Sequence, residues 1–176
     1  VDYRQGLTTG ISAEERCSTV RALANPNVGA DDYVRPGHIF PLVAKEGGVM
    51  IRSGHTEAAV DLCRLSGLEE VGVISELVND DGTVKRGQQV AEFAAEHDLK
   101  MVSVSDLIAW RQRTERMVER VNEQPVETVA GPAYAMTYST PYDPMHHLAI
   151  VYGDILDGRN VPVRLQLESV LDDVFG

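Results

Sequence analysis

"IRSGHTEAAVDLCRLSG", residues 51–67, joins a charged turn to an amphipathic segment. Ala58, Leu62 and Leu65 recur at the spacing of one helical face, and a glycine closes the stretch, as it closes many helices. The hydroxyl of Thr56 can cap the first turn of such a helix. The stretch therefore predicts an amphipathic helix that starts next to an arginine and a histidine.

Short apolar segments alternate with helical ones on both sides of this stretch. Helices are predicted after Ser12, where Glu15 completes a capping box, and at residues 87–99 and 105–123. Strands are predicted at residues 40–45, 48–52, 70–75 and 100–104. This alternation indicates an α/β (α+β) fold with a mixed sheet flanked by helices.

The chain changes character after the last of these helices. Residues 121–133 are typical of a linker, and residues 134–140, 147–155 and 161–169 alternate apolar and polar side chains as strands do. The sequence therefore predicts a main unit at residues 1–120, a linker at 121–133 and a small β-rich unit at 134–176.

Composition limits the classes of function. The 176 residues include 43% hydrophobic residues, enough for one domain with a core, and carry a net charge of −11, which argues against nucleic-acid binding. Cys17 and Cys63 belong to no CxxC or Cys/His cluster, as expected in a reducing compartment. No apolar run approaches the ~18–20 residues that cross a bilayer, so we expect no membrane contact and a cytoplasmic location.

The turn at residues 51–57 has the chemistry of a site for an anion. A helix N-terminus offers free N–H groups and partial positive charge, Arg52 can hold a phosphate in bidentate fashion, and His55 can bind a divalent ion. A lone histidine is more often a capping or surface residue. The neighbouring arginine and helix start favour a functional role here.

Three more residues are candidates, each with a structural alternative. His38 follows a Pro-Gly turn and either holds that turn in place or acts in acid–base catalysis. Glu76 follows the predicted strand 70–75 and is either a pKa-shifted base or a solvated strand end. Thr9 lies in "LTTG", residues 7–10, which could hold a phosphate but lacks the lysine of a P-loop.

Three motifs in order carry a resemblance to a known family: RPGH (35–38), RSGHTEA (52–58) and ELVNDDGT (76–83). From about Gly6 to Arg111 the chain resembles the C-terminal half of 3,4-dihydroxy-2-butanone 4-phosphate synthase, an enzyme of riboflavin biosynthesis. The resemblance implies a lyase that converts D-ribulose 5-phosphate, a sugar phosphate, to L-3,4-dihydroxy-2-butanone 4-phosphate and formate. It also implies Mg²⁺ or Mn²⁺ as cofactor and a homodimer.

The resemblance assigns roles to individual residues. It makes His38 and Glu76 the catalytic pair and His55 the metal ligand. The substrate-binding residues that it implies are Thr9, Arg52, Ser53, Gly54, His55 and Thr56.

Residues 134–176 are similar to the start of GTP cyclohydrolase II. Ser169 stands where that family has a zinc-binding cysteine, and a serine hydroxyl is a poor zinc ligand, so we expect no zinc and no cyclohydrolase activity. This segment would then stabilise or regulate the synthase.

The acidic loop that supplies a metal-binding glutamate in the synthase family has no counterpart in these residues. We expect the chain to begin midway through that domain, to leave apolar residues such as Val71–Ile74 uncovered, and to be inactive alone. Two alternatives stay open: a truncated, non-catalytic homologue with a structural or regulatory role, and an unrelated metal-dependent sugar-phosphate isomerase or aldolase.

Overall fold

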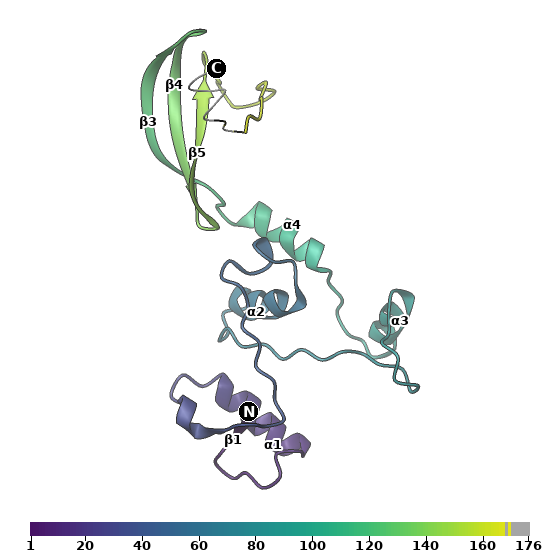
Figure 1. Cartoon of the computed structure of the whole chain (residues 1–176). Helices are drawn as coiled ribbons and strands as arrows, with labels where there is room; N and C mark the ends of the chain where they lie inside the picture. Colours follow the sequence, from purple (N-terminus) through teal and green to yellow (C-terminus); the bar gives the residue numbers. More distant parts are fainter. Residues whose placement is uncertain (168, 170–176) are drawn as a thin grey trace. The chain divides into compact units, whose positions relative to one another are not determined.

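The computed structural model describes residues 1–167 and 169. The chain divides into two units, Val1–Met117 and Val118–Gly176, each described here by itself (Figure 1). The first unit holds the helices and a two-stranded sheet, and the second holds a three-stranded sheet. The predicted combination of an α+β unit with a small β-rich unit is confirmed.

The first unit opens with a small layer of two strands and one helix. Strands β1 (Asp2–Tyr3) and β2 (Tyr33–Val34) pair antiparallel, and helix α1 (Ala13–Leu23) packs against β1. Ser12 caps α1 as predicted, because its Oγ accepts a hydrogen bond of 3.1 Å from the Glu15 N–H. The buried Thr19 hydroxyl ties the two layers together by accepting a 2.9 Å bond from the Tyr3 N–H.

The remaining helices follow the predicted positions in part. The 3₁₀ helix η1 (Ala30–Asp32) precedes β2, and the 3₁₀ helix η2 (Gly48–Met50) precedes α2 (His55–Leu65). Helix α3 (Gln88–Glu96) and helix α4 (Val104–Thr114) follow. The helices η2, α2 and α4 pack together, and Leu107 of α4 is buried.

Helix α2 buries a polar face instead of its apolar stripe. Glu57 is 0% exposed and Asp61 is 2% exposed, whereas Leu62 is 42% exposed. The two carboxylates are four residues apart, so they lie on one face of the helix. Glu57 accepts a hydrogen bond from the backbone N–H of Lys45, and Asp61 accepts one from the backbone N–H of Val49 in η2. These bonds offset the cost of removing the charges from water.

The predicted strands of the first unit do not form. Within the described residues, positions 40–45 and 70–75 belong to no strand, residues 48–50 form η2, and α4 begins at Val104. A strand needs the N–H and C=O groups of a neighbour, and these segments pair with none in the described part of the chain. The predicted mixed sheet is therefore wrong, since both observed sheets are antiparallel.

The same segments carry much of the exposed apolar surface. Val71, Val73 and Ile74 are 39%, 68% and 47% exposed, which confirms the expectation that this stretch is uncovered, and Phe40 is 85% exposed.

The long helix predicted at residues 105–123 ends early. Helix α4 stops at Thr114 because Glu115 adopts an extended conformation, and strand β3 (Glu119–Thr128) begins soon after. The linker predicted at residues 121–133 is also wrong, since β3 covers most of it and β4 begins at Gly131. Pro125 is tolerated within β3 because β3 is an edge strand.

The second unit is an antiparallel sheet in the order β3-β4-β5, drawn in Figure 1 as one curved layer. The strands β4 (Gly131–Thr140) and β5 (Asp143–Val151) match the predicted segments 134–140 and 147–155 in part. Ala133 and Ala135 of the central strand are buried. The third predicted segment, 161–169, forms no strand over its described residues, and positions 168 and 170–176 lie outside the described part.

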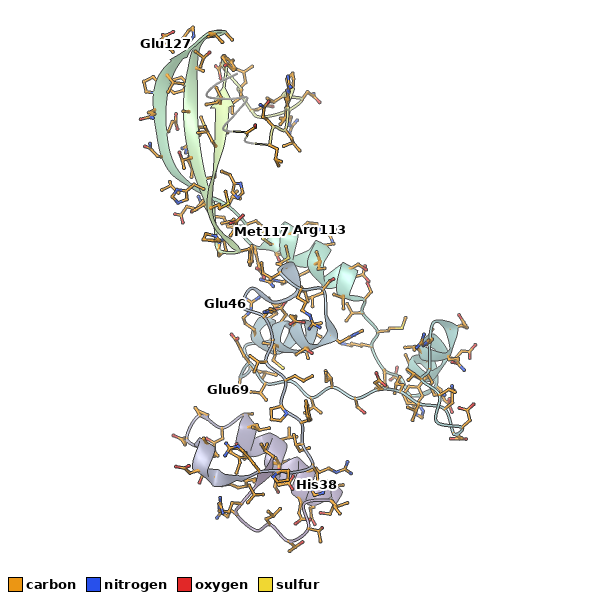
Figure 2. All side chains as sticks on the ribbon, in the orientation of Figure 1. His38, Glu46, Glu69, Arg113, Met117 and Glu127 are labelled. Atoms are coloured by element: carbon orange, nitrogen blue, oxygen red, sulfur yellow. The ribbon has the colours of Figure 1, made fainter. Side chains whose placement is uncertain are left out.

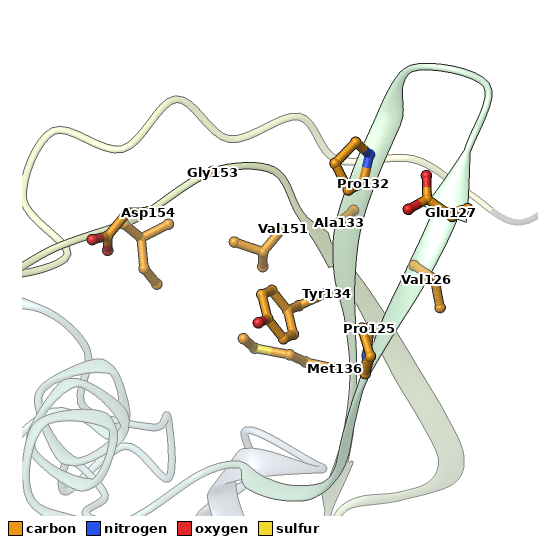
Figure 3. A pocket seen from close by; sticks show the side chains of 11 residues that line it. Pro125, Val126, Glu127, Pro132, Ala133, Tyr134, Met136, Val151, Gly153 and Asp154 are labelled. Carbon is orange, nitrogen blue, oxygen red and sulfur yellow. The ribbon is translucent and has the colours of Figure 1, made fainter.

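The second unit has a hollow of about 660 Å³ on its sheet (Figure 3). Tyr134, Met136 and Val151 form part of its apolar wall, and none of the predicted site residues lines it. No helix in the described part of the chain has the length and apolar character that a membrane crossing requires.

Candidate active site

A buried carboxylate holds the histidine of the RPGH motif. Oδ1 of Asp2 accepts a hydrogen bond of 2.7 Å from the His38 backbone N–H, and Oδ2 lies 2.8 Å from His38 Nδ1. The Asp2 side chain is 4% exposed and that of His38, labelled in Figure 2, is 43% exposed. The backbone hydrogen bond from His38 is the largest cause that lowers the pKa of Asp2, followed by the bond to the imidazole. The pair is therefore a carboxylate that fixes one ring nitrogen and leaves Nε2 for other chemistry.

Two glycines let the chain close around this pair. Gly10 has a φ of +77°, and a Cβ there would overlap Asp2 Oδ2 and His38 Nδ1. A Cβ on Gly37 would overlap the backbone of Val1. The Val1 carbonyl accepts a 3.1 Å bond from the Ile39 N–H, which fixes the RPGH segment alongside the first residues.

The threonines before Gly10 are held by a single carboxylate. Glu15 Oε1 accepts bonds from the Thr8 N–H at 2.6 Å and the Thr8 hydroxyl at 2.9 Å, and Oε2 lies 3.4 Å from the Thr9 hydroxyl. The bond from the Thr8 N–H is the largest cause that lowers the pKa of Glu15 to about 2. The predicted capping box is thus only half formed, because the Glu15 side chain turns to the TTG segment.

A second group of contacts surrounds Arg52. Arg52 Nη1 lies 3.0 Å from Oε2 and 3.3 Å from Oε1 of Glu57, and Oε1 also accepts a 3.0 Å bond from the Lys45 N–H. The bond from Lys45 is the largest cause that lowers the pKa of Glu57. The Arg52 side chain is 60% exposed and that of Glu57 is 1% exposed, so the guanidinium reaches solvent from a buried anchor.

The residues after Arg52 form the start of α2. Gly54 is the N-cap and His55 is the first helical residue. The prediction that Thr56 caps the helix is wrong, since it lies within the first turn and the N-cap glycine supplies no side-chain bond. Ser53 and His55 are exposed, and neither side chain makes a hydrogen bond or ion pair with the part of the chain that the structure describes.

Glu76 is exposed and belongs to no strand. The nearest regular feature is an isolated bridge between Val78 and Val84. The predicted placement at the end of a buried strand is therefore wrong, because residues 70–75 find no pairing partner among the described residues.

The structure gathers the candidates into two local groups. One contains His38 and Thr9, and the other contains Arg52, Gly54 and the start of α2. No hydrogen bond or ion pair of residues 1–167 joins these groups or links Glu76 to either one.

The described residues do not fit a divalent cation by themselves. Within residues 1–167 and 169, no three His, Cys, Asp or Glu side chains converge on a point. His55 offers one imidazole, whereas Mg²⁺ prefers several oxygen ligands.

The sequence did not predict Asp2 or Glu57 as site residues, and it predicted Glu15 only as part of a capping box. Each of the three carboxylates accepts hydrogen bonds from residues five or more positions away in the chain. A local sequence pattern does not reveal such contacts. Glu15 had the signal of the capping box, and Glu57 had one as a charged residue four positions before Asp61 on one helical face.

The fold agrees with the matches of the chain to known proteins. Residues 1–110 match the family model of 3,4-dihydroxy-2-butanone 4-phosphate synthase, so the chain belongs to that family. Residues 119–176 match the model of GTP cyclohydrolase II.

Particular relatives combine the same two regions. Riboflavin biosynthesis protein RibBA of Salinispora arenicola (strain CNS-205) is 50% identical over 176 residues, which are 100% of this chain and 42% of that protein. The bifunctional riboflavin biosynthesis protein RIBA 1, chloroplastic, of Arabidopsis thaliana is 46% identical over 100% of this chain and 32% of its own length. The chain thus spans less than half the length of these relatives.

Solved structures show the same fold. RibBX, a two-domain 3,4-dihydroxy-2-butanone 4-phosphate synthase from A. baumannii, matches with a TM-score of 0.80 and 42% identity over 90% of this chain and 47% of that chain. The synthase of Candida albicans matches with a TM-score of 0.61 and 46% identity over 62% of this chain and 56% of that chain.

Proposed function

We propose that this chain is part of a riboflavin-biosynthesis lyase that converts D-ribulose 5-phosphate to L-3,4-dihydroxy-2-butanone 4-phosphate and formate. The membership of the family supports the reaction class. The observation that carries the proposal is the Asp2–His38 pair, since it turns the histidine of the RPGH motif into an oriented base.

His38 is the group that moves protons. Asp2 is held as a carboxylate and pairs with Nδ1, so a neutral His38 would carry its proton on Nδ1 and its lone pair on Nε2. An imidazole in this state can remove the proton beside the ketone of a sugar phosphate. The exposure of the His38 side chain leaves it accessible to a substrate.

Arg52 and the start of α2 hold the anionic group of the substrate. The guanidinium keeps donors beyond Nη1, and the first turn of α2 adds N–H groups and partial positive charge. Ser53 and Thr56 add hydroxyl donors, and Gly54 allows close approach of the backbone. Thr9 would contribute a hydroxyl from the TTG segment.

Glu76 is proposed as the second proton carrier, and its place in the described residues gives this assignment no further support. His55 is proposed as one ligand of Mg²⁺ or Mn²⁺, the other ligands coming from substrate oxygens and groups outside the described residues. Such an ion would act as a Lewis acid. No zinc is proposed, because Ser169 replaces a thiolate.

The reaction is tested on the complete product of the gene that encodes this chain, incubated with D-ribulose 5-phosphate and Mg²⁺. We expect formate and the four-carbon ketone phosphate in equal amounts. The 176-residue chain alone is expected to release no formate, because no three metal-ligating side chains converge within its described residues. A complete gene product without activity would support the alternative of a structural or regulatory homologue.

A homodimer is also proposed, and light scattering of the complete gene product tests it. A monomeric mass at micromolar concentration would contradict it.

A further inference from the structure

Glu57 is a charged residue that the proposed chemistry does not use, yet it is the most deeply buried side chain among the described residues. Removing a carboxylate from water is costly unless hydrogen bonds replace the lost solvent. Glu57 must therefore be held in place by contacts that the fold or the function needs.

Its contacts all lead to the segment before α2. Oε1 accepts the Lys45 N–H at 3.0 Å, and both oxygens face Arg52 Nη1 at 3.3 Å and 3.0 Å. One carboxylate thus joins the backbone before η2 to the guanidinium after it. Its position in the first turn of α2 also suits the helix dipole.

Gly54 leaves the room for this arrangement. A Cβ at Gly54 would overlap Glu57 Oε2 and lie 3.0 Å from Arg52 Nη1. Between Arg52 and Glu57 only a glycine lets the guanidinium fold back over the N-cap. The GHTE part of the motif therefore has a geometric reason for its glycine and its glutamate.

The geometry points to Glu57 as a positioning residue that aims the guanidinium of Arg52 at the anionic group of the substrate. Glu57 is bound to Nη1 alone, so the remaining donors of the 60% exposed Arg52 stay directed outward. This inference rests on the proposed function, since it assigns a role within the same site. Glu57 itself does not touch the substrate.

Asp61 provides the matched control. It is buried on the same face of α2, one turn later, and accepts the Val49 N–H at 2.9 Å. Its charged partners are Arg111 and Arg64, and no bond to Arg52 is present among the described residues. Loss of Asp61 should therefore damage the structure without acting through Arg52.

The test is a double-mutant cycle in the complete gene product with Mg²⁺, measuring kcat and KM for D-ribulose 5-phosphate. Glu57→Gln should raise KM about tenfold and change kcat by less than about threefold, because it loosens a group that binds substrate and transition state alike. In an Arg52→Ala background the same change should alter KM by less than about twofold. Asp61→Asn should change KM by the same factor in both backgrounds.

Binding of inorganic phosphate, measured by calorimetry, repeats the cycle without turnover. A wild-type protein that binds phosphate but releases no formate would defeat the proposed function, while coupling between Arg52 and Glu57 in phosphate binding would still support the positioning role. If Glu57→Gln does not fold, Glu57→Asp replaces it in the cycle, because aspartate keeps the charge but has a shorter side chain. The inference would be overturned if the Glu57 variants changed KM, or the affinity for phosphate, by the same factor with and without Arg52.

Discussion

Nδ1 of His38 lies 2.8 Å from Oδ2 of Asp2, across 36 positions of sequence, and the same carboxylate accepts the His38 backbone N–H at 2.7 Å. One buried acid thus fixes both the position of the segment and the orientation of the ring. Structure and chemistry depend on the same carboxylate, whose Oδ1 accepts the backbone N–H and whose Oδ2 contacts the ring, so the pair is the most informative target for mutation.

Asp2→Asn should lower the rate of formate release by the complete gene product by about 10²-fold or more, because the amide no longer holds the Nδ1–H tautomer. Steady-state kinetics with D-ribulose 5-phosphate measure the effect. Asp31→Asn is the control, since its side chain is exposed and distant from His38 in the hydrogen-bond pattern. Retention of full activity by Asp2→Asn would remove His38 as an oriented base.

Gly10→Ala should abolish most activity. The new Cβ would overlap the Asp2–His38 pair, and a φ of +77° adds a backbone cost of about 1 kcal/mol. Gly6→Ala separates the two effects, because Gly6 has a φ of +75° and no atom within 4 Å of an added Cβ. Both variants should lose thermal stability, but only Gly10→Ala should lose turnover. Equal losses of turnover would mean that backbone strain alone is responsible.

Protonation of Glu15 at acid pH should lower the thermal stability of the first unit. Its folded-state pKa is lowered from 4.5 to about 2, so its contribution is present above 4.5 and is lost as the pH falls toward 2. A pH series of thermal melts of the 176-residue chain should show this loss, and Glu15→Gln should remove part of it. Glu14 lies in the same turn but makes no side-chain bond to the TTG segment in the described residues. Glu14→Gln should therefore lose as much thermal stability at acid pH as the parent chain does.

Arg111→Met should unfold the packing of η2, α2 and α4. Arg111 is 2% exposed, bonds to Asp61 Oδ2 at 2.8 Å and the Gly47 carbonyl at 2.9 Å, and pairs with Glu115. Breaking a buried pair by removing one partner costs about 3–5 kcal/mol. Urea denaturation of the 176-residue chain measures it. Arg113→Met, an exposed neighbour on α4, should change stability by less than about 0.5 kcal/mol, and a similar loss in both variants would contradict the buried-pair account.

Local patterns predicted the helices well and the strands poorly. Ser12 and its downstream helix depend on nearest neighbours, so α1 could be located from sequence. Residues 70–75 look like a buried strand in isolation, but a strand exists only beside a partner, and no described segment supplies one. The end of α4 at Thr114 and the strand over Pro125 also depend on pairing between β3 and β4, which no short window contains.

The candidate site divides in the same way. Arg52, His55 and His38 could be selected because their residue types suit anions, metals and protons. Asp2 and Glu57 could not, because their roles arise from contacts across 36 positions and around a buried turn. Glu76 was selected because it follows a segment predicted to be a strand and lies in a family motif, but that strand does not form and no contact in the described residues gives Glu76 a partner.

The proposed lyase reaction is tested most directly by quantitative NMR of the formate that the complete gene product and its His38→Ala variant release from D-ribulose 5-phosphate in the presence of Mg²⁺. The wild-type protein should release one formate per sugar phosphate consumed, and the variant should release formate at a rate at least about 10²-fold lower. Equal formate release by the two proteins, or consumption of the sugar phosphate without formate, would contradict the proposal.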